Sequence, residues 1–154
     1  MPKRGRLEHN PPSALREGPR PPRRLFFAFA VKIKFRRINH VQVCIPPGAE
    51  ERAREFYGRV LGLAEIPKPA ALRERGGLWY EVADVQLHIG VEEPAGPSKR
   101  HPAFEVEDVG AVRSYLEGRG VRTRDEPEVE GFARFSFYDP FGNRFELMER
   151  RPRG

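Results

Sequence analysis

Three histidines and one glutamate recur at similar distances along the chain, and they are the residues best suited to chemistry. His40 and His101 lie 61 positions apart, and His88 and Glu146 lie 58 apart. Imidazole nitrogens and carboxylate oxygens are suitable ligands for a divalent metal when rigid elements hold them together. The spacing predicts that each pair occupies equivalent places in a repeated unit, so that all four side chains converge on one metal site.

Alternation along the expected strands places these four residues on one kind of surface. In the stretch VQLHIGVEE (85–93), the aliphatic side chains point to one face and His88 points to the other. His40, His101 and Glu146 stand in the same relation to the aliphatic and aromatic residues of their own strands. We therefore expect all four on the faces that line a cleft, away from the core.

The elements that must position these residues form one unit repeated twice after Arg37. The first unit, about 37–94, reads as a strand at INHVQVCI, a helix at PPGAEERAREFYGRVLGL ended by Gly62, a weaker connecting strand, and strands at GLWYEV and VQLHIGVEE. The second unit, about 100–150, reads as a strand at HPAFEVED, a helix at DVGAVRSYLEGRG capped by Asp108 and ended by Gly120, and strands at VRTR, FARFSFYD and RFELMER. Each unit is βαβββ. The fold class is therefore α+β, with the two units forming a cupped mixed sheet around a cleft and the helices outside.

Other side chains are expected on the cleft side of the same strands. These candidate substrate-cleft residues are Gln42, Tyr80, Arg134, Tyr138 and Arg144. Either arginine could hold an anionic substrate or remain a solvated charge at the rim. Trp79 alternates with Tyr80 and is expected to pack beneath the helix, and Cys44 is expected to be a small buried residue.

The positive charge of the chain belongs to its first 35 residues. They carry nine Lys/Arg and two Glu, whereas the remainder is close to neutral, out of a total net charge of +6. We interpret residues 1–35 as a Pro/Arg-rich, disordered tail, residues 36–150 as the folded domain and residues 151–154 as a second tail. The domain lacks a basic stripe, which argues against nucleic acid as its main partner. The single cysteine and the absence of a long apolar run are compatible with a cytoplasmic protein that has no membrane partner.

Four motifs, in order, resemble the vicinal oxygen chelate superfamily. They are the INHV opening, EFYGRVLGL in the first helix, His101 at the start of the second unit and DPFGNRFELME near the end. This superfamily includes glyoxalase I, fosfomycin-resistance enzymes, extradiol dioxygenases and bleomycin-resistance proteins, and the resemblance covers residues 37–150. It implies a divalent metal held by His40, His101 and Glu146. His88 stands where glyoxalase I has a glutamate as fourth ligand, which argues against glyoxalase activity.

Three hypotheses follow from these observations. The first is a metal-dependent lyase, isomerase or dioxygenase. In this enzyme Fe, Ni, Zn or Mn would bind two neighbouring oxygens of a small substrate, and Glu146 would serve as ligand and catalytic proton shuttle. His88 would be a ligand, a hydrogen-bond donor to one of the ligands, or a contact to the substrate. Without it, the remaining ligands form the two-His-one-carboxylate set typical of Fe(II). The second is a metal-free small-molecule binding protein of the bleomycin-resistance type. The third assigns the function to the basic tail, as a tether to nucleic acid or to an acidic surface. A homodimer would permit a metal site either within one chain or shared between two.

Overall fold

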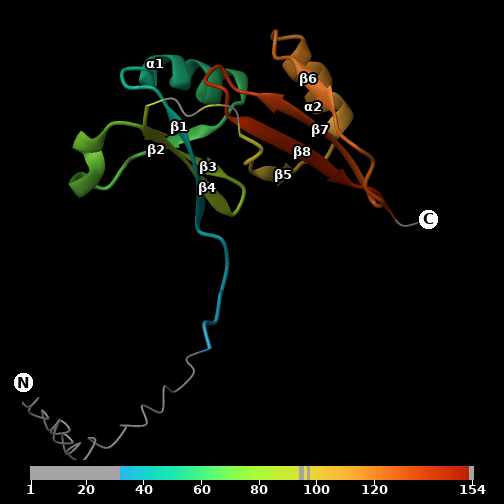
Figure 1. The fold of residues 1–154 in the computed structure, drawn as a ribbon, viewed down its shortest axis with the longest axis horizontal. Coiled ribbons are helices and arrows are strands. Elements are labelled where there is room, and N and C mark those ends of the chain that lie inside the picture. The colour runs from blue at the N-terminus through green and yellow to red at the C-terminus, as the bar shows by residue number, and fades with distance from the viewer. Residues whose placement is uncertain (1–31, 94–95, 97, 153–154) are drawn as a thin grey trace, which may run out of the picture. The chain divides into compact units, whose positions relative to one another are not determined.

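The structure is a computed structural model that describes residues 32–93, 96 and 98–152 (Figure 1). The chain divides into two units, Met1–Phe35 and Arg36–Gly154, and the second contains every element discussed below. The expectations for residues 1–31 lie outside the described residues and stay predictions. Among the described residues, no helix is long and apolar enough to cross a membrane.

The first module is a four-stranded mixed sheet in the order β1-β4-β3-β2. Strand β1 (His40–Ile45) runs parallel to β4 (Val85–Val91), and β4 runs antiparallel to β3 (Leu78–Val82). Strand β2 (Ala64–Ile66) completes the sheet beside β3. The four strands correspond to those expected from the sequence, including the weak connecting strand.

The helix of this module differs in type from the expected α-helix. A single α-helical turn, α1 (Glu50–Ala53), continues as a π-helix, η1 (Arg54–Val60). The Leu61 amide donates to the Phe56 carbonyl at 2.9 Å, which is the five-residue spacing of a π-helix. Gly62, with φ of 71°, then ends the helix as expected. A 3-10 helix, η2 (Ala70–Arg75), lies in the loop before β3.

The second module repeats the pattern, with strand order β5-β8-β7-β6. Its elements are β5 (Ala103–Glu105), α2 (Val109–Glu117), β6 (Thr123–Asp125), β7 (Phe132–Tyr138) and β8 (Arg144–Arg150). The Asp108 side chain accepts a hydrogen bond from the Ala111 amide at 2.8 Å, so the expected N-cap is confirmed. The two βαβββ modules, and with them the α+β fold class, are confirmed.

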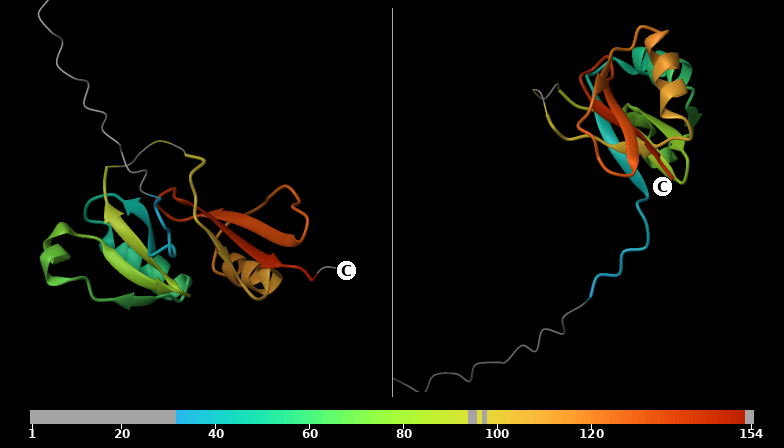
Figure 2. Two further views of the ribbon diagram at one scale, coloured as in Figure 1. Left: turned by 90° about the horizontal axis from the view of Figure 1, so that it is seen from below. Right: turned by 90° about the vertical axis from the view of Figure 1, so that its right-hand side faces the viewer.

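One apolar core runs through both modules. Tyr57 of η1 packs against Tyr80 of the first sheet at 5.8 Å between ring centroids and against Phe145 of the second sheet at 6.1 Å. Phe56 lies beside Phe137 in the same way. The helix therefore joins the two sheets, which remain separate four-stranded sheets among the described strands, each with its own helix alongside (Figure 2). The opposite face of each sheet carries the polar residues considered next.

Candidate functional site

His101 and Glu146 form the first part of the candidate site, on the polar face of the second sheet. The His101 Nε2 atom lies 3.2 Å from Glu146 Oε2. The Glu146 amide donates to the Pro102 carbonyl at 3.0 Å, which ties β8 to the segment that carries the histidine. The Glu146 side chain is only 6% exposed and that of His101 is 27% exposed. A rigid backbone contact thus brings two possible metal ligands together.

The hydrogen bonds of His101 determine which nitrogen is free. Its Nδ1 atom lies 2.8 Å from the Lys99 carbonyl oxygen, which can only accept, so Nδ1 carries the proton. In the neutral ring, Nε2 then has a lone pair, and this lone pair faces a carboxylate oxygen. Two acceptors at this distance require a proton or a cation between them. The arrangement fits either an imidazolium–carboxylate ion pair or a metal site.

Two arginines neutralise the carboxylates on this face. Arg134 donates from Nη1 to Glu146 Oε1 at 2.7 Å, and Arg144 donates from Nη2 to Glu126 Oε1 at 2.6 Å. Ser136 also donates to Glu126, and this hydrogen bond, followed by the Arg144 contact, lowers the pKa of Glu126. Each arginine already has a carboxylate partner, so neither offers the uncompensated positive charge that an anionic substrate would need.

A stack of three rings forms the second part of the candidate site, on the polar face of the first sheet. The His88 ring lies between the Trp79 indole, at 3.9 Å and 2° between planes, and the His40 ring, at 4.2 Å and 14°. The His88 Nε2 atom also lies 2.9 Å from Gln86 Oε1. Burial, followed by the neighbouring His40 and Lys68, lowers the pKa of His88 and so favours its neutral form.

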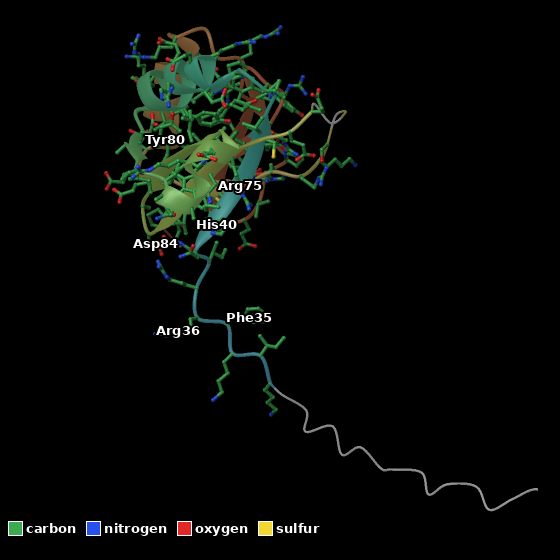
Figure 3. All side chains as sticks on the ribbon, turned by 90° about the vertical axis from the view of Figure 1, so that its left-hand side faces the viewer. Phe35, Arg36, His40, Arg75, Tyr80 and Asp84 are labelled. Atoms are coloured by element: carbon green, nitrogen blue, oxygen red, sulfur yellow. The ribbon has the colours of Figure 1, made fainter. Side chains whose placement is uncertain are left out.

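The expectations for Trp79 and Tyr80 were wrong, because the two residues have exchanged faces. Strand pairing places Trp79 opposite His88 and Tyr80 opposite Leu87. Tyr80 is fully buried and packs against Tyr57 of η1, whereas His40 lies at the start of β1; both are labelled in Figure 3. The cause is the strand register: His88 pairs with Trp79, nine positions before it, whereas its repeat equivalent Glu146 pairs with Ser136, ten positions before it. A shift by one position between the repeats moves every side chain to the other face.

The expected convergence of four metal ligands was also wrong for a single chain. Across the ranges 32–93 and 98–152 with residue 96, no three His, Cys, Asp or Glu side chains gather closely enough to hold a metal ion. The ligands instead form two pairs, His40 with His88 and His101 with Glu146. Each pair belongs to one module, because β1 neighbours β4 in the first sheet and His101 lies just before β5, the neighbour of β8 in the second.

The remaining cleft candidates lie beside these pairs. Gln42 is exposed on β1, with its Nε2 atom 3.9 Å from the sulfur of half-buried Cys44, and Tyr138 is exposed beneath the Arg124 guanidinium, 5.1 Å from its ring centroid. A cavity of about 490 Å³ lies between β1, the segment before β5 and the β7–β8 turn. Its described lining includes Gln42, Cys44, His101, Asn143 and Arg144, but not His40, His88 or Glu146.

Sequence reasoning missed four residues that contact the candidate site residues. Trp79 was assigned to the core, and neither Gln86 nor the pair of Glu126 and Ser136 was considered. The two-residue turn at Ala83 and Asp84 was the available signal for Trp79, because a tight hairpin sets the register of the strands that it joins.

Comparison with known proteins places the chain in a family. The sequence model of the Glyoxalase/Bleomycin resistance protein/Dioxygenase superfamily matches residues 37–147, and the chain belongs to this superfamily. A putative glyoxalase family protein from Bacillus anthracis is similar at 43% identity over 79% of this chain and 100% of that one, with a TM-score of 0.74.

More distant structures share the fold. The fosfomycin resistance protein FosX from Listeria monocytogenes has 19% identity over 77% of this chain and 94% of its own, with a TM-score of 0.61. TnmS3, an antibiotic binding protein from Streptomyces sp. CB03234, has 21% identity over 78% of this chain and 100% of its own, also with a TM-score of 0.61. No curated protein matches the chain.

Proposed function

We propose that this protein is a divalent-metal-dependent enzyme that acts on a small substrate through two neighbouring oxygen atoms. The observation that carries the proposal is the approach of His101 Nε2 to Glu146 Oε2 at 3.2 Å, with the other ring nitrogen, Nδ1, engaged by the Lys99 carbonyl. Membership of a superfamily that includes metal-dependent enzymes supports the same reading.

The donors in one chain fit a metal in kind but not in number. His101 and Glu146 supply one nitrogen and one oxygen, and a stable transition-metal site needs at least a third protein ligand. His40 is the third candidate, and its ring is exposed at the start of β1. We propose that His40 of a second copy completes the site, so that the functional protein is a homodimer with two equivalent sites.

The surrounding residues have roles that follow from their contacts. The Lys99 carbonyl fixes the tautomer of His101, and Arg134 holds one oxygen of Glu146 so that the other faces the histidine. The bound ion would supply Lewis-acid chemistry toward a developing oxyanion on the substrate. Glu146 is the carboxylate placed to hold or move a substrate proton.

Metal content tests the proposal directly. Tag-free protein purified without chelators, then reloaded in turn with Fe(II), Ni(II), Zn(II) and Mn(II), is analysed by elemental mass spectrometry. We expect about one ion per chain in the wild type and near-complete loss in His101→Ala. His9→Ala is the matched control, since it removes a histidine outside the described residues and should leave the metal content unchanged. A wild type that retains none of the four ions contradicts the proposal.

A metal-free binding protein is the second candidate. The specific observation in its favour is that Glu146, the carboxylate of the expected ligand set, already forms an ion pair with Arg134. A compensated carboxylate has less need of a cation. This candidate predicts that a small ligand raises the melting temperature of the metal-free protein and of His101→Ala equally.

A further inference from the structure

We infer that His88 is a positioning residue for His40 and not a metal ligand, although it stands at the place of a fourth ligand. The inference rests on the proposed function and assigns different roles to the two histidines of the first module. Its basis is the three-ring stack of Trp79, His88 and His40.

The geometry of the stack prevents the two histidines from binding one ion together. A metal must lie near the plane of an imidazole ring, about 2.0–2.1 Å from a nitrogen along its lone pair. The rings of His40 and His88 are stacked with centroids 4.2 Å apart and planes only 14° from parallel. An ion shared between them would therefore lie about 2 Å above each ring plane, where neither nitrogen has a lone pair.

His88 is also the less mobile of the two rings. Trp79 covers its other face at 3.9 Å, Gln86 lies against its Nε2 atom, and only 7% of the residue is exposed. To turn a nitrogen toward a shared ion, His88 would have to break the contact with the indole and the contact with Gln86. His40 is exposed, and apart from the stack with His88 its one side-chain hydrogen bond among the described residues joins Nδ1 to Asn39 Oδ1 at 2.9 Å.

The stack therefore orients His40 from one side. Strand pairing sets Gln42 of β1 and Trp79 of β3 opposite His88 of β4. His40 lies two positions before Gln42 and therefore shares its face, so the three rings lie on one face across β3, β4 and β1. A fixed neighbouring ring reduces the rotamer freedom that His40 would lose on binding metal. The resulting centre has His40, His101 and Glu146 as protein ligands and leaves coordination positions for substrate oxygens.

Two substitutions at His88 separate positioning from ligation. His88→Phe keeps a flat ring in the stack but has no nitrogen, whereas His88→Ala removes both. Metal dissociation constants are measured on full-length protein by competition with a chromophoric chelator, using the ion that the wild type retains best. We expect His88→Phe to bind within about threefold of the wild type and His88→Ala to bind roughly 10- to 100-fold more weakly. Equal weakening of both variants would make His88 a ligand, and unchanged binding in His88→Ala would end the positioning role.

Substitution of Trp79 gives an independent readout, because the indole cannot be a metal ligand. Trp79→Leu should weaken metal binding and Trp79→Phe should largely retain it, since only the phenyl ring preserves the stack. Trp79 is the single tryptophan, so its emission in metal-free protein should change in His88→Ala. Equal affinity in the two Trp79 variants, or unchanged emission, contradicts the inference.

His40→Ala distinguishes failure of this inference from failure of the proposed function. Loss of metal in His40→Ala with equal binding in all His88 and Trp79 variants overturns the positioning role alone. A wild type without metal, or His40→Ala that binds like the wild type, overturns both.

Discussion

The Tyr57 hydroxyl donates a hydrogen bond to Asp139, 82 positions further along the chain. This buried contact ties the π-helix of the first module to the β7–β8 turn of the second. Asp139 also accepts from the amides of Phe141 and Asn143, and the Asn143 side chain donates to the Cys44 carbonyl at 2.8 Å. One carboxylate therefore shapes the turn DPFGN and joins the two modules within a chain.

Loss of the hydroxyl should destabilise the protein at Tyr57 but not at Tyr80. Tyr57→Phe removes a partner of a buried carboxylate and should lower the free energy of unfolding by about 1–3 kcal/mol. The Tyr80 hydroxyl has no hydrogen-bond partner among the described residues, and burial raises its pKa to about 12. Tyr80→Phe should therefore be neutral or slightly stabilising, within about 1 kcal/mol. Urea denaturation measures both, and equal destabilisation would show that Tyr80 has a partner.

If two copies share each metal site, two variants that cannot bind metal alone should bind it when mixed. His40→Ala and His101→Ala each lack one ligand, but a heterodimer has one intact site made from the two chains. Mixing after subunit exchange should restore roughly one quarter of the wild-type metal content, because half of the dimers are mixed and each has one complete site. Elemental analysis of the separated proteins and of the mixture measures this. Metal binding by neither the mixture nor a co-expressed pair would argue for a site within one chain.

Arg134 is expected to stabilise the protein through Glu146. Arg134→Met leaves a carboxylate that is 6% exposed without its cation and should cost about 2–4 kcal/mol of unfolding free energy. Adding Glu146→Gln should recover most of this loss, because the uncompensated charge is gone. Arg124→Met, at an exposed position of the second sheet, is the control and should change stability by less than about 0.5 kcal/mol. Thermal and urea unfolding give the four values, and additive losses would show that Arg134 acts through other contacts.

Glu126 should make stability depend on pH in the acid range. Its hydrogen bond from Ser136, aided by Arg144, lowers its pKa in the folded protein below the ordinary value of 4.5. The unfolded state then binds a proton first as the pH falls, so the stabilisation is complete above pH 4.5 and decreases below it. Glu126→Gln should flatten the dependence of the unfolding free energy on pH between 5 and 3. Glu128→Gln, at an exposed neighbour, should retain it; the same slope in both variants would contradict the assignment.

The repeat and the alternation of side chains were sufficient to predict much of this protein. Hydrophobic periodicity placed all eight strands and the helical segment of each repeat. The alternation of side chains also placed His101 and Glu146 on the same face of the second unit, where they lie close together. These properties are local, since each depends on the period of a strand or helix and on the capping residues at its ends.

The faces of Trp79 and Tyr80, and the separation of the ligands into two pairs, were decided only by the tertiary structure. Strand register depends on the turn that joins two strands, and turns of different length shift one repeat against the other. The relative placement of the modules depends on contacts such as Tyr57 with Asp139, between residues far apart in sequence. Local periodicity cannot encode such contacts, because they form only when the helix and both sheets pack into one core.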